Sequence, residues 1–186
     1  MTEQHLLSDA EFRADCDKCA ALCCVAFAFD RSDDFGLDKK AGEVCPNLDG
    51  MACMMHGERA AQGFAGCIAF DCHGAGEVVV QEMFGGRNWR DDPAVFEPMM
   101  EAFRASVPLQ KTRWLLHLAA RLPLSVADRQ RCDQLQAVTR DFPRWTAEQL
   151  LAFARNSWCA EVEEFLSTLK SYVAAPTQAG TVAGQA

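Results

Sequence analysis

Eight cysteines gather in the first part of this 186-residue sequence, within a stretch of 57 residues. They are Cys16, Cys19, Cys23, Cys24, Cys45, Cys53, Cys67 and Cys72. Thiolates are soft ligands that suit zinc, copper(I) and iron-sulfur clusters, whereas calcium and magnesium prefer oxygen ligands. Zinc takes four ligands, so these residues could hold two zinc sites, or one cluster beside structural thiols. The sequence therefore predicts a metal site that holds zinc or an iron-sulfur cluster.

The cellular compartment decides how such cysteines are used. The first residues are acidic and lack the basic start and apolar run of a secretory signal. No stretch of the sequence approaches the roughly 18 apolar residues of a membrane span. We therefore expect a cytoplasmic protein, and a reducing cytoplasm favours metal binding over a disulfide framework.

The cysteine spacing leaves the metal undecided. Only Cys16 and Cys19 form a C-x-x-C pair, so the repeated pairs of a simple zinc finger and the longer run of bacterial ferredoxins are both missing. Glycine and proline beside several cysteines predict tight turns, in which backbone N–H groups can point at the sulfur atoms. His56 lies three residues after Cys53 and could replace a thiol, and this alternative stays open.

The ordered pattern resembles the bacterial cysteine-cluster (CxxCxxCC-type) family of zinc- or iron-chelating domains. The residues that carry this resemblance are Cys16-x-x-Cys19-x-x-x-Cys23-Cys24, Cys45-Pro-Asn-Leu48, Cys53-x-x-His56-x-x-Arg59, Gly66-Cys67 and Cys72. A further likeness is to the cysteine-rich region that accompanies pentapeptide repeats in actinobacterial proteins. It is carried by Phe64-x-Gly66-Cys67-x-x-Phe70-Asp71-Cys72 and by Phe84-Gly85-Gly86-Arg87-x-Trp89-Arg90. The repeats themselves are missing here, so the resemblance implies a metal site and nothing about a repeat helix.

The charge distribution argues against polyanionic partners. The net charge is -8, and residues 1–72 hold thirteen acids against six bases. Such a chain is repelled by nucleic-acid phosphates and anionic lipids, so we expect neither nucleic acid nor a membrane as a partner. The arginines of the second half, such as Arg113 and Arg121, are interspersed with acids and are predicted to lie on solvated faces.

The elements that carry the cysteines are predicted to be short. Ser8 and Glu11 form a capping-box signature that opens a helix from Asp9 to about Cys24. Three cysteines of this helix would share an arc of roughly 60°. The polar loop 30–42 is predicted to be solvated, Asp49-Gly50 predicts a turn, and residues 77–84 fit either a short strand or a helix.

The second half predicts a helical bundle. A buried central helix is expected over residues 109–122, with Pro108, Pro123 and Pro143 at helix boundaries. Thr146 and Gln149 form a capping box for a last helix that ends near Val173. Breaker clusters at 84–86 and 91–93 place a boundary near Arg90.

The expected fold class is therefore mainly α, with one short strand or hairpin. An irregular cysteine-rich metal-binding region, residues 1–90, is expected to lie on a helical bundle, residues 91–173, followed by a flexible tail, residues 174–186. Cys132 and Cys159 fall in the bundle and are assigned to helix packing.

Two function classes remain open, beside a structural interpretation in which all eight cysteines are inert or disulfide-bonded. The sequence has no G-x-S-x-G, H-E-x-x-H or P-loop motif, so no catalytic residue is named. The leading hypothesis is a cytosolic metal-binding protein with a chelating, redox or partner-docking function, in which the bundle contacts another protein. The alternative is an enzyme whose cluster or thiolate acts on a substrate held between the cysteine region and the bundle.

Overall fold

The computed structural model describes residues 8–173, which are mainly helical, as predicted. The α-helices are α1 (Cys23–Ala26), α2 (Ala65–Ala69), α3 (Ala75–Glu77), α4 (Phe96–Ala119), α5 (Val126–Val138), α6 (Ala147–Phe153), α7 (Trp158–Thr168) and α8 (Lys170–Val173). Short 3₁₀ turns cover Asp9–Phe12, Cys16–Lys18, Pro93–Val95 and Phe142–Arg144, and a π-helix covers Val78–Met83. Strands β1 (Leu48–Asp49) and β2 (Ala52–Cys53) form the one antiparallel hairpin of the described residues. The predicted tail, residues 174–186, lies outside the described part of the chain.

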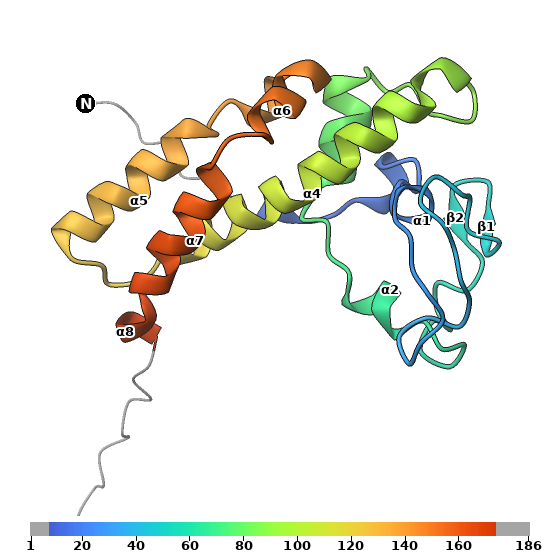
Figure 1. Cartoon of the computed structure of the whole chain (residues 1–186), viewed down its shortest axis with the longest axis horizontal. Helices are drawn as coiled ribbons and strands as arrows, with labels where there is room; N and C mark the ends of the chain where they lie inside the picture. The colour runs from blue at the N-terminus through green and yellow to red at the C-terminus, as the bar shows by residue number, and fades with distance from the viewer. Residues whose placement is uncertain (1–7, 174–186) are drawn as a thin grey trace, which may run out of the picture.

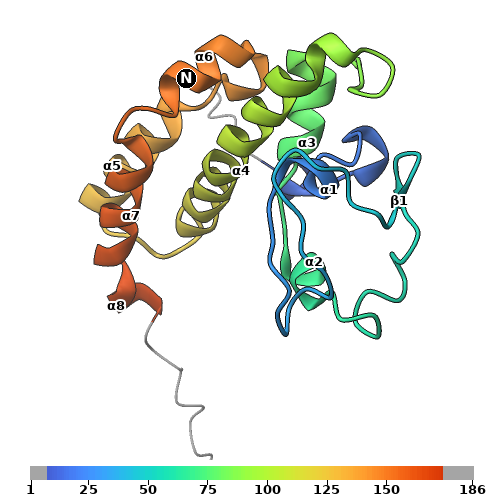
Figure 2. The ribbon, with the colours of Figure 1, turned by 45° about the vertical axis from the view of Figure 1, so that its right-hand side comes forward.

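Helix α4 is the element on which both halves of the chain are assembled (Figure 1). It contacts α5, α6 and α7 of the bundle, and also α1 and α3 of the cysteine-rich half. Met99, Met100 and Phe103 on this helix are almost completely buried. Figure 2 shows α4 running between the C-terminal helices and the cysteine-rich loops. The predicted division of the chain at residue 90 stays a prediction.

Pro108 lies inside α4, so its predicted position at a helix boundary is wrong. A proline within a helix removes one backbone hydrogen bond and costs about 3 kcal/mol. The helix continues because elements from both halves of the chain bury it on several sides. Tertiary packing of the helix therefore outweighs the preference of proline against helix interiors.

The predicted last helix is three helices. Its capping box is confirmed, because Thr146 N–H donates to Gln149 Oε1 over 2.8 Å and Gln149 N–H donates to Thr146 Oγ1 over 3.3 Å. The helix ends after Phe153, and Asn156 Oδ1 accepts from the backbone N–H of Trp158 over 2.9 Å. This hydrogen bond to the Asn156 side chain replaces a helical backbone hydrogen bond, and it accounts for the interruption between α6 and α7. Most of the predicted core face is nonetheless buried, namely Leu150, Trp158, Val162, Phe165 and Leu169.

The predicted first helix, Asp9 to Cys24, is wrong as a single element. Two 3₁₀ turns are followed by a sharp bend, in which Ala20 and Ala21 have φ angles of 50° and 54°. Left-handed backbone at a residue with a Cβ costs roughly 1–2 kcal/mol, so tertiary contacts must hold this bend. Both alanines are buried, and the indole N–H of Trp89 donates to the carbonyl of Ala20 over 2.8 Å. The three cysteines therefore do not share one helical face.

Of three further predictions, those for the Asp49-Gly50 turn and for a helix at residues 78–83 are right, and the one for Arg113 is wrong. The turn at Asp49-Gly50 is confirmed and joins β1 to β2, with Gly50 at a φ of 54°. Residues 78–83 are helical, so the helix alternative is the right one there. Arg113 was expected on a solvated face and is instead 2% exposed, with its guanidinium 5.5 Å from the ring centre of Phe12 and 5.1 Å from that of Phe142.

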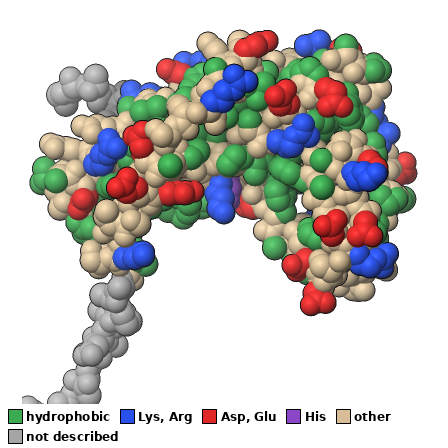
Figure 3. All heavy atoms as spheres, in the orientation of Figure 1, with side chains coloured by type: hydrophobic (Ala, Val, Ile, Leu, Met, Phe, Trp, Pro, Cys, Tyr) green, Lys and Arg blue, Asp and Glu red, His purple; other side chains and the backbone are tan. Residues whose placement is uncertain are grey.

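The surface drawn in Figure 3 carries Lys and Arg side chains interspersed with Asp and Glu. Over residues 8–173, none of the helices combines the length and apolar character needed to cross a membrane.

Candidate metal centre

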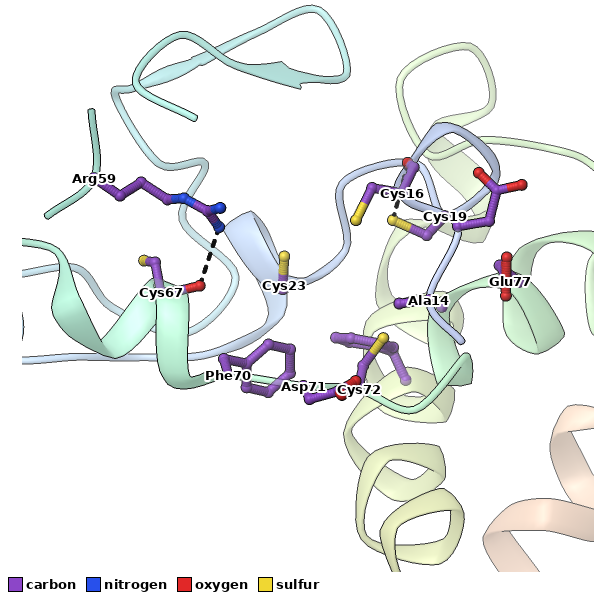
Figure 4. A pocket seen from close by; sticks show the side chains of 13 residues that line it. Ala14, Cys16, Cys19, Cys23, Arg59, Cys67, Phe70, Asp71, Cys72 and Glu77 are labelled. Carbon is purple, nitrogen blue, oxygen red and sulfur yellow. Dashed lines mark hydrogen bonds between the residues drawn. The ribbon is translucent and has the colours of Figure 1, made fainter. Parts of the chain in front are cut away.

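Five cysteines from different segments surround one small cavity of about 100 Å³. They are Cys16, Cys19, Cys23, Cys67 and Cys72. Figure 4 shows Cys23 between Cys67 on one side and Cys16 and Cys19 on the other. Phe70 and Phe103 contribute apolar wall. The charged residues of the lining are Arg59, Asp15, Asp71 and Glu77. The cavity thus brings together cysteines that lie up to 56 positions apart in the sequence.

A larger cavity of about 1140 Å³ adjoins the first and shares four of its cysteines. Its walls add Cys24, Cys45, Cys53 and His56, together with the rings of Phe27, Phe29, Phe35 and Phe64. All eight cysteines singled out in the sequence therefore line one or both cavities. The larger cavity is lined by residues between Ala10 and Glu77 only, so it lies within the cysteine-rich half.

The thiols surround these cavities without converging on one point. Within residues 8–173, no group of three or more His, Cys, Asp or Glu side chains is placed to hold a metal ion together. All ten cysteines are free thiols, and the Sγ atoms of Cys23 and Cys24 are 4.0 Å apart. Each thiol can turn about its Cα–Cβ bond between staggered rotamers, so sulfur atoms around a small cavity can move inward with little change in the backbone. Several soft donors on a partly apolar cavity fit zinc or an iron-sulfur cluster.

Close backbone contact fixes the position of Cys19. A Cβ atom at Gly76 would lie only 2.6 Å from the Cβ of Cys19, so glycine permits the Cys72–Gly76 segment to lie directly against it. Gly74, within this segment, has a φ of 79° and directly precedes α3. The Cys19 thiol also lies 3.3 Å from the carbonyl oxygen of Cys16.

The thiols that share the small cavity oppose one another's ionisation. Burial, together with the neighbouring Cys23, raises the pKa of Cys19 to about 12. Burial also raises the pKa of Cys72, although the backbone N–H groups of Gly76 and Gly74 favour its thiolate. Without a bound cation these groups stay protonated at neutral pH, and several thiolates can coexist here only if a positive charge compensates them.

Lys39 is a feature of the site that sequence reasoning missed. The loop 30–42 was expected to be solvated, yet Lys39 is 4% exposed. Its ammonium group donates to the carbonyl oxygens of Val25, Lys40 and Glu43 over 3.1, 3.1 and 3.0 Å. Burial lowers the pKa of this lysine, and the nearby thiols of Cys45 and Cys24 act in the opposite direction. Nothing in the sequence distinguishes it from Lys40 beside it.

Arg59 connects two cysteine-bearing segments. Its Nε atom donates to the carbonyl of His56 over 2.9 Å, and Nη1 donates to the carbonyl of Cys67 over 3.2 Å. Arg59 also lines both cavities, so it brings a positive charge to the thiols as well as joining the loop to α2.

The two remaining cysteines line neither cavity. Cys132 is fully buried in the helical core, with its Sγ 3.8 Å from the carbonyl of Leu116. Burial raises its pKa to about 11. Cys159 is half-buried on α7 and packs against the same core.

One relative provides the comparison with known proteins. Over 161 residues, the chain is 34% identical to the uncharacterized protein YybG of Bacillus subtilis (strain 168). The match covers 84% of this chain but 56% of the relative, so the chain spans little more than half of that protein's length. No family model matches the chain, and no solved structure matches it.

Proposed function

We propose that this chain is a cytoplasmic metal-binding protein whose eight clustered cysteines hold zinc or an iron-sulfur cluster as thiolates. The observation that carries the proposal is the gathering of all eight around two adjoining cavities, although they come from separate turns, strands and helices. The likeness of the cysteine pattern to the bacterial cysteine-cluster family points the same way. Zinc would make the site structural or chelating, whereas a cluster would supply electron transfer or redox sensing.

Charge compensation supports the proposal independently of the cysteine count. Four thiolates around one metal leave a net negative charge, which is costly in a partly buried site unless cations lie nearby. Lys39 is buried beside Cys24 and Cys45, and Arg59 lines both cavities. Arg13 and Lys18 also line the larger cavity, together with the acidic Asp15, Asp17 and Glu77. In this proposal, the bundle around α4 covers the site and offers its outer face to a protein partner.

The alternative function is an enzyme whose cluster or thiolate acts on a bound substrate. The larger cavity favours this alternative. Its volume of about 1140 Å³ is large enough for a small molecule, and it has aromatic walls beside the cysteines. The substrate would then lie within the cysteine-rich half, next to the thiols, and not between that half and the bundle.

The test is elemental analysis of protein purified without oxygen, combined with acid-labile sulfide determination and a visible absorption spectrum. Iron with matching sulfide and absorption near about 400 nm would identify a cluster. Colourless protein with bound zinc would identify a zinc site. A Cys132→Ser variant is the control, and it should hold as much metal as the wild type. Wild-type protein that holds neither metal, and that takes up none when the reduced protein is titrated with Zn²⁺, would refute the proposal.

A further inference from the structure

The eight cysteines are distributed unequally between the two cavities, and this inference rests on the proposed metal-binding function. Cys72 lines only the small cavity, whereas Cys24, Cys45 and Cys53 line only the larger one. The four shared cysteines are Cys16, Cys19, Cys23 and Cys67. The backbone contacts associate each shared residue with one of the two sides.

Cys16 and Cys19 belong with Cys72. Gly76, four residues after Cys72, is packed against the side chain of Cys19, and Cys19 in turn contacts the carbonyl of Cys16. In Figure 4 these three cysteines lie on the same side of the cavity, next to α3 and α4. A shift of the Cys72–Gly76 segment would therefore move Cys19 with it.

Cys67 belongs with Cys24, Cys45 and Cys53. Hydrogen bonds link this group in sequence: Cys45 N–H donates to the carbonyl of Cys24 over 2.9 Å, and Leu48 N–H donates to the carbonyl of Cys45 over 3.0 Å. Leu48 is then paired with Cys53 in the β1–β2 hairpin.

The link continues from the hairpin to α2. His56 N–H donates to the carbonyl of Cys53 over 3.1 Å, and Arg59 joins the carbonyl of His56 to that of Cys67. Figure 4 shows Cys67 and Arg59 on the side of Cys23 that faces away from Cys16 and Cys19.

The vicinal pair Cys23 and Cys24 sits where the two groups meet. The two cysteines are adjacent at the start of α1, with their Sγ atoms 4.0 Å apart, and they differ in the cavities that they line. Cys24 is tied to Cys45 through its carbonyl, and it lines the larger cavity only. Cys23 also lines the small cavity, beside Cys72.

We propose that the cysteines form two separate four-thiolate metal centres, one held by Cys16, Cys19, Cys23 and Cys72 and the other by Cys24, Cys45, Cys53 and Cys67. Four thiolates are the full ligand set of a structural zinc ion and of a four-cysteine iron-sulfur cluster. The pair Cys23-Cys24 supplies one ligand to each centre and holds the two centres next to each other.

The test compares metal content in the wild type, Cys72→Ser, Cys53→Ser and the double variant, with Cys132→Ser as control. Each single variant should keep half of the wild-type metal, the double variant should keep none, and Cys132→Ser should keep all of it. Loss of all metal in either single variant would indicate one shared centre and overturn the division, while leaving the proposed function intact. Full retention in both single variants would overturn the division as well. A wild type that binds no metal would instead refute the proposed function.

A second measurement covers the case in which the variants do not fold. Metal-free wild type is titrated with Co²⁺, whose thiolate complexes absorb in the visible and near ultraviolet. Saturation at two equivalents with the absorption of four-thiolate sites supports two centres. Saturation at one equivalent of Co²⁺ would overturn the proposal of two separate centres.

Discussion

The ammonium group of Lys39 donates a hydrogen bond to the carbonyl oxygen of Val25, 14 residues away, over 3.1 Å. Val25 lies in α1, two residues after Cys23. The loop that follows the first four cysteines is thereby fixed to the helix on which two of them lie. A buried cation is consequently held beside thiols that, as metal ligands, would be anionic.

Lys39→Met is expected to weaken metal binding and to destabilise the fold. The substitution keeps most of the side-chain volume but removes three hydrogen bonds. The carbonyls of Val25 and Lys40 still accept from the N–H groups of Gly42 and Glu43, whereas the carbonyl of Glu43 loses its donor, which costs on the order of 1–3 kcal/mol. Chelator competition would measure the metal affinity, and thermal unfolding the stability. Lys40→Met is the matched control, since Lys40 is exposed, and it should behave as the wild type. Equal affinities in the two variants would mean that Lys39 stabilises the loop alone.

Gly76→Ala is expected to disturb the site directly. The new methyl group would meet the Cβ of Cys19 at 2.6 Å, and this contact cannot be relieved by a side-chain rotation, because Cβ is fixed to the backbone. We expect a loss of stability of about 1–3 kcal/mol and reduced metal content. Gly57→Ala is the control, because a methyl group there meets nothing within 4 Å. If Gly76→Ala retains full metal content, the packing of α3 against Cys19 is not needed for binding.

Arg113→Met is expected to leave stability unchanged or to raise it by about 2 kcal/mol. The guanidinium is buried with its Nε and Nη2 atoms unpartnered, and burial lowers its pKa to about 10. At neutral pH, below this value, the folded state bears the full cost of desolvating the charge. Methionine keeps contact with Phe12 and Phe142 without that cost. Calorimetric unfolding would test this, with the more exposed Arg121→Met as comparison. A clear loss of stability in Arg113→Met alone would mean that the cation contributes through its two aromatic neighbours and its hydrogen bond to Gln110.

Metal-free and metal-loaded protein are expected to respond to pH in opposite ways. The pKa of Cys19 is raised to about 12 in the folded chain, against about 8.5 for a free thiol. Its contribution to stability is therefore complete below about pH 8.5 and is lost as the pH rises toward 12. For this residue alone the loss is on the order of 1 to 2 kcal/mol at pH 10. Metal binding needs thiolates, so the loaded protein should instead lose its metal on acidification.

Unfolding temperatures of the two forms between pH 5 and pH 10 would check this pair of expectations. Cys19→Ser should show a weaker alkaline loss in the metal-free form. A metal-free wild type that becomes more stable between pH 8 and pH 10 would show that the thiols are not held protonated by burial.

Several features of this protein are determined by local sequence. The Thr146–Gln149 capping box and the Asp49-Gly50 turn depend on residues within four positions of one another, so local chemistry is enough to predict them. The helical face of α6 and α7 follows from apolar periodicity in the same way. The cysteine pattern likewise identifies soft donors, because ligand preference is a property of the side chain itself.

Only the tertiary structure decided the rest. Local signals favour a helix through Ala20 and Ala21, but the hydrogen bond from Trp89, 69 residues away, and the burial of both alanines hold a left-handed bend there. Pro108 stays within α4 because packing from both halves of the chain surrounds that helix. Lys39 has the sequence context of a solvated residue, and only the approach of α1 supplies the carbonyl of Val25. In each case the deciding partner is distant in the sequence, so its contribution to the free energy of folding is not encoded in any local pattern.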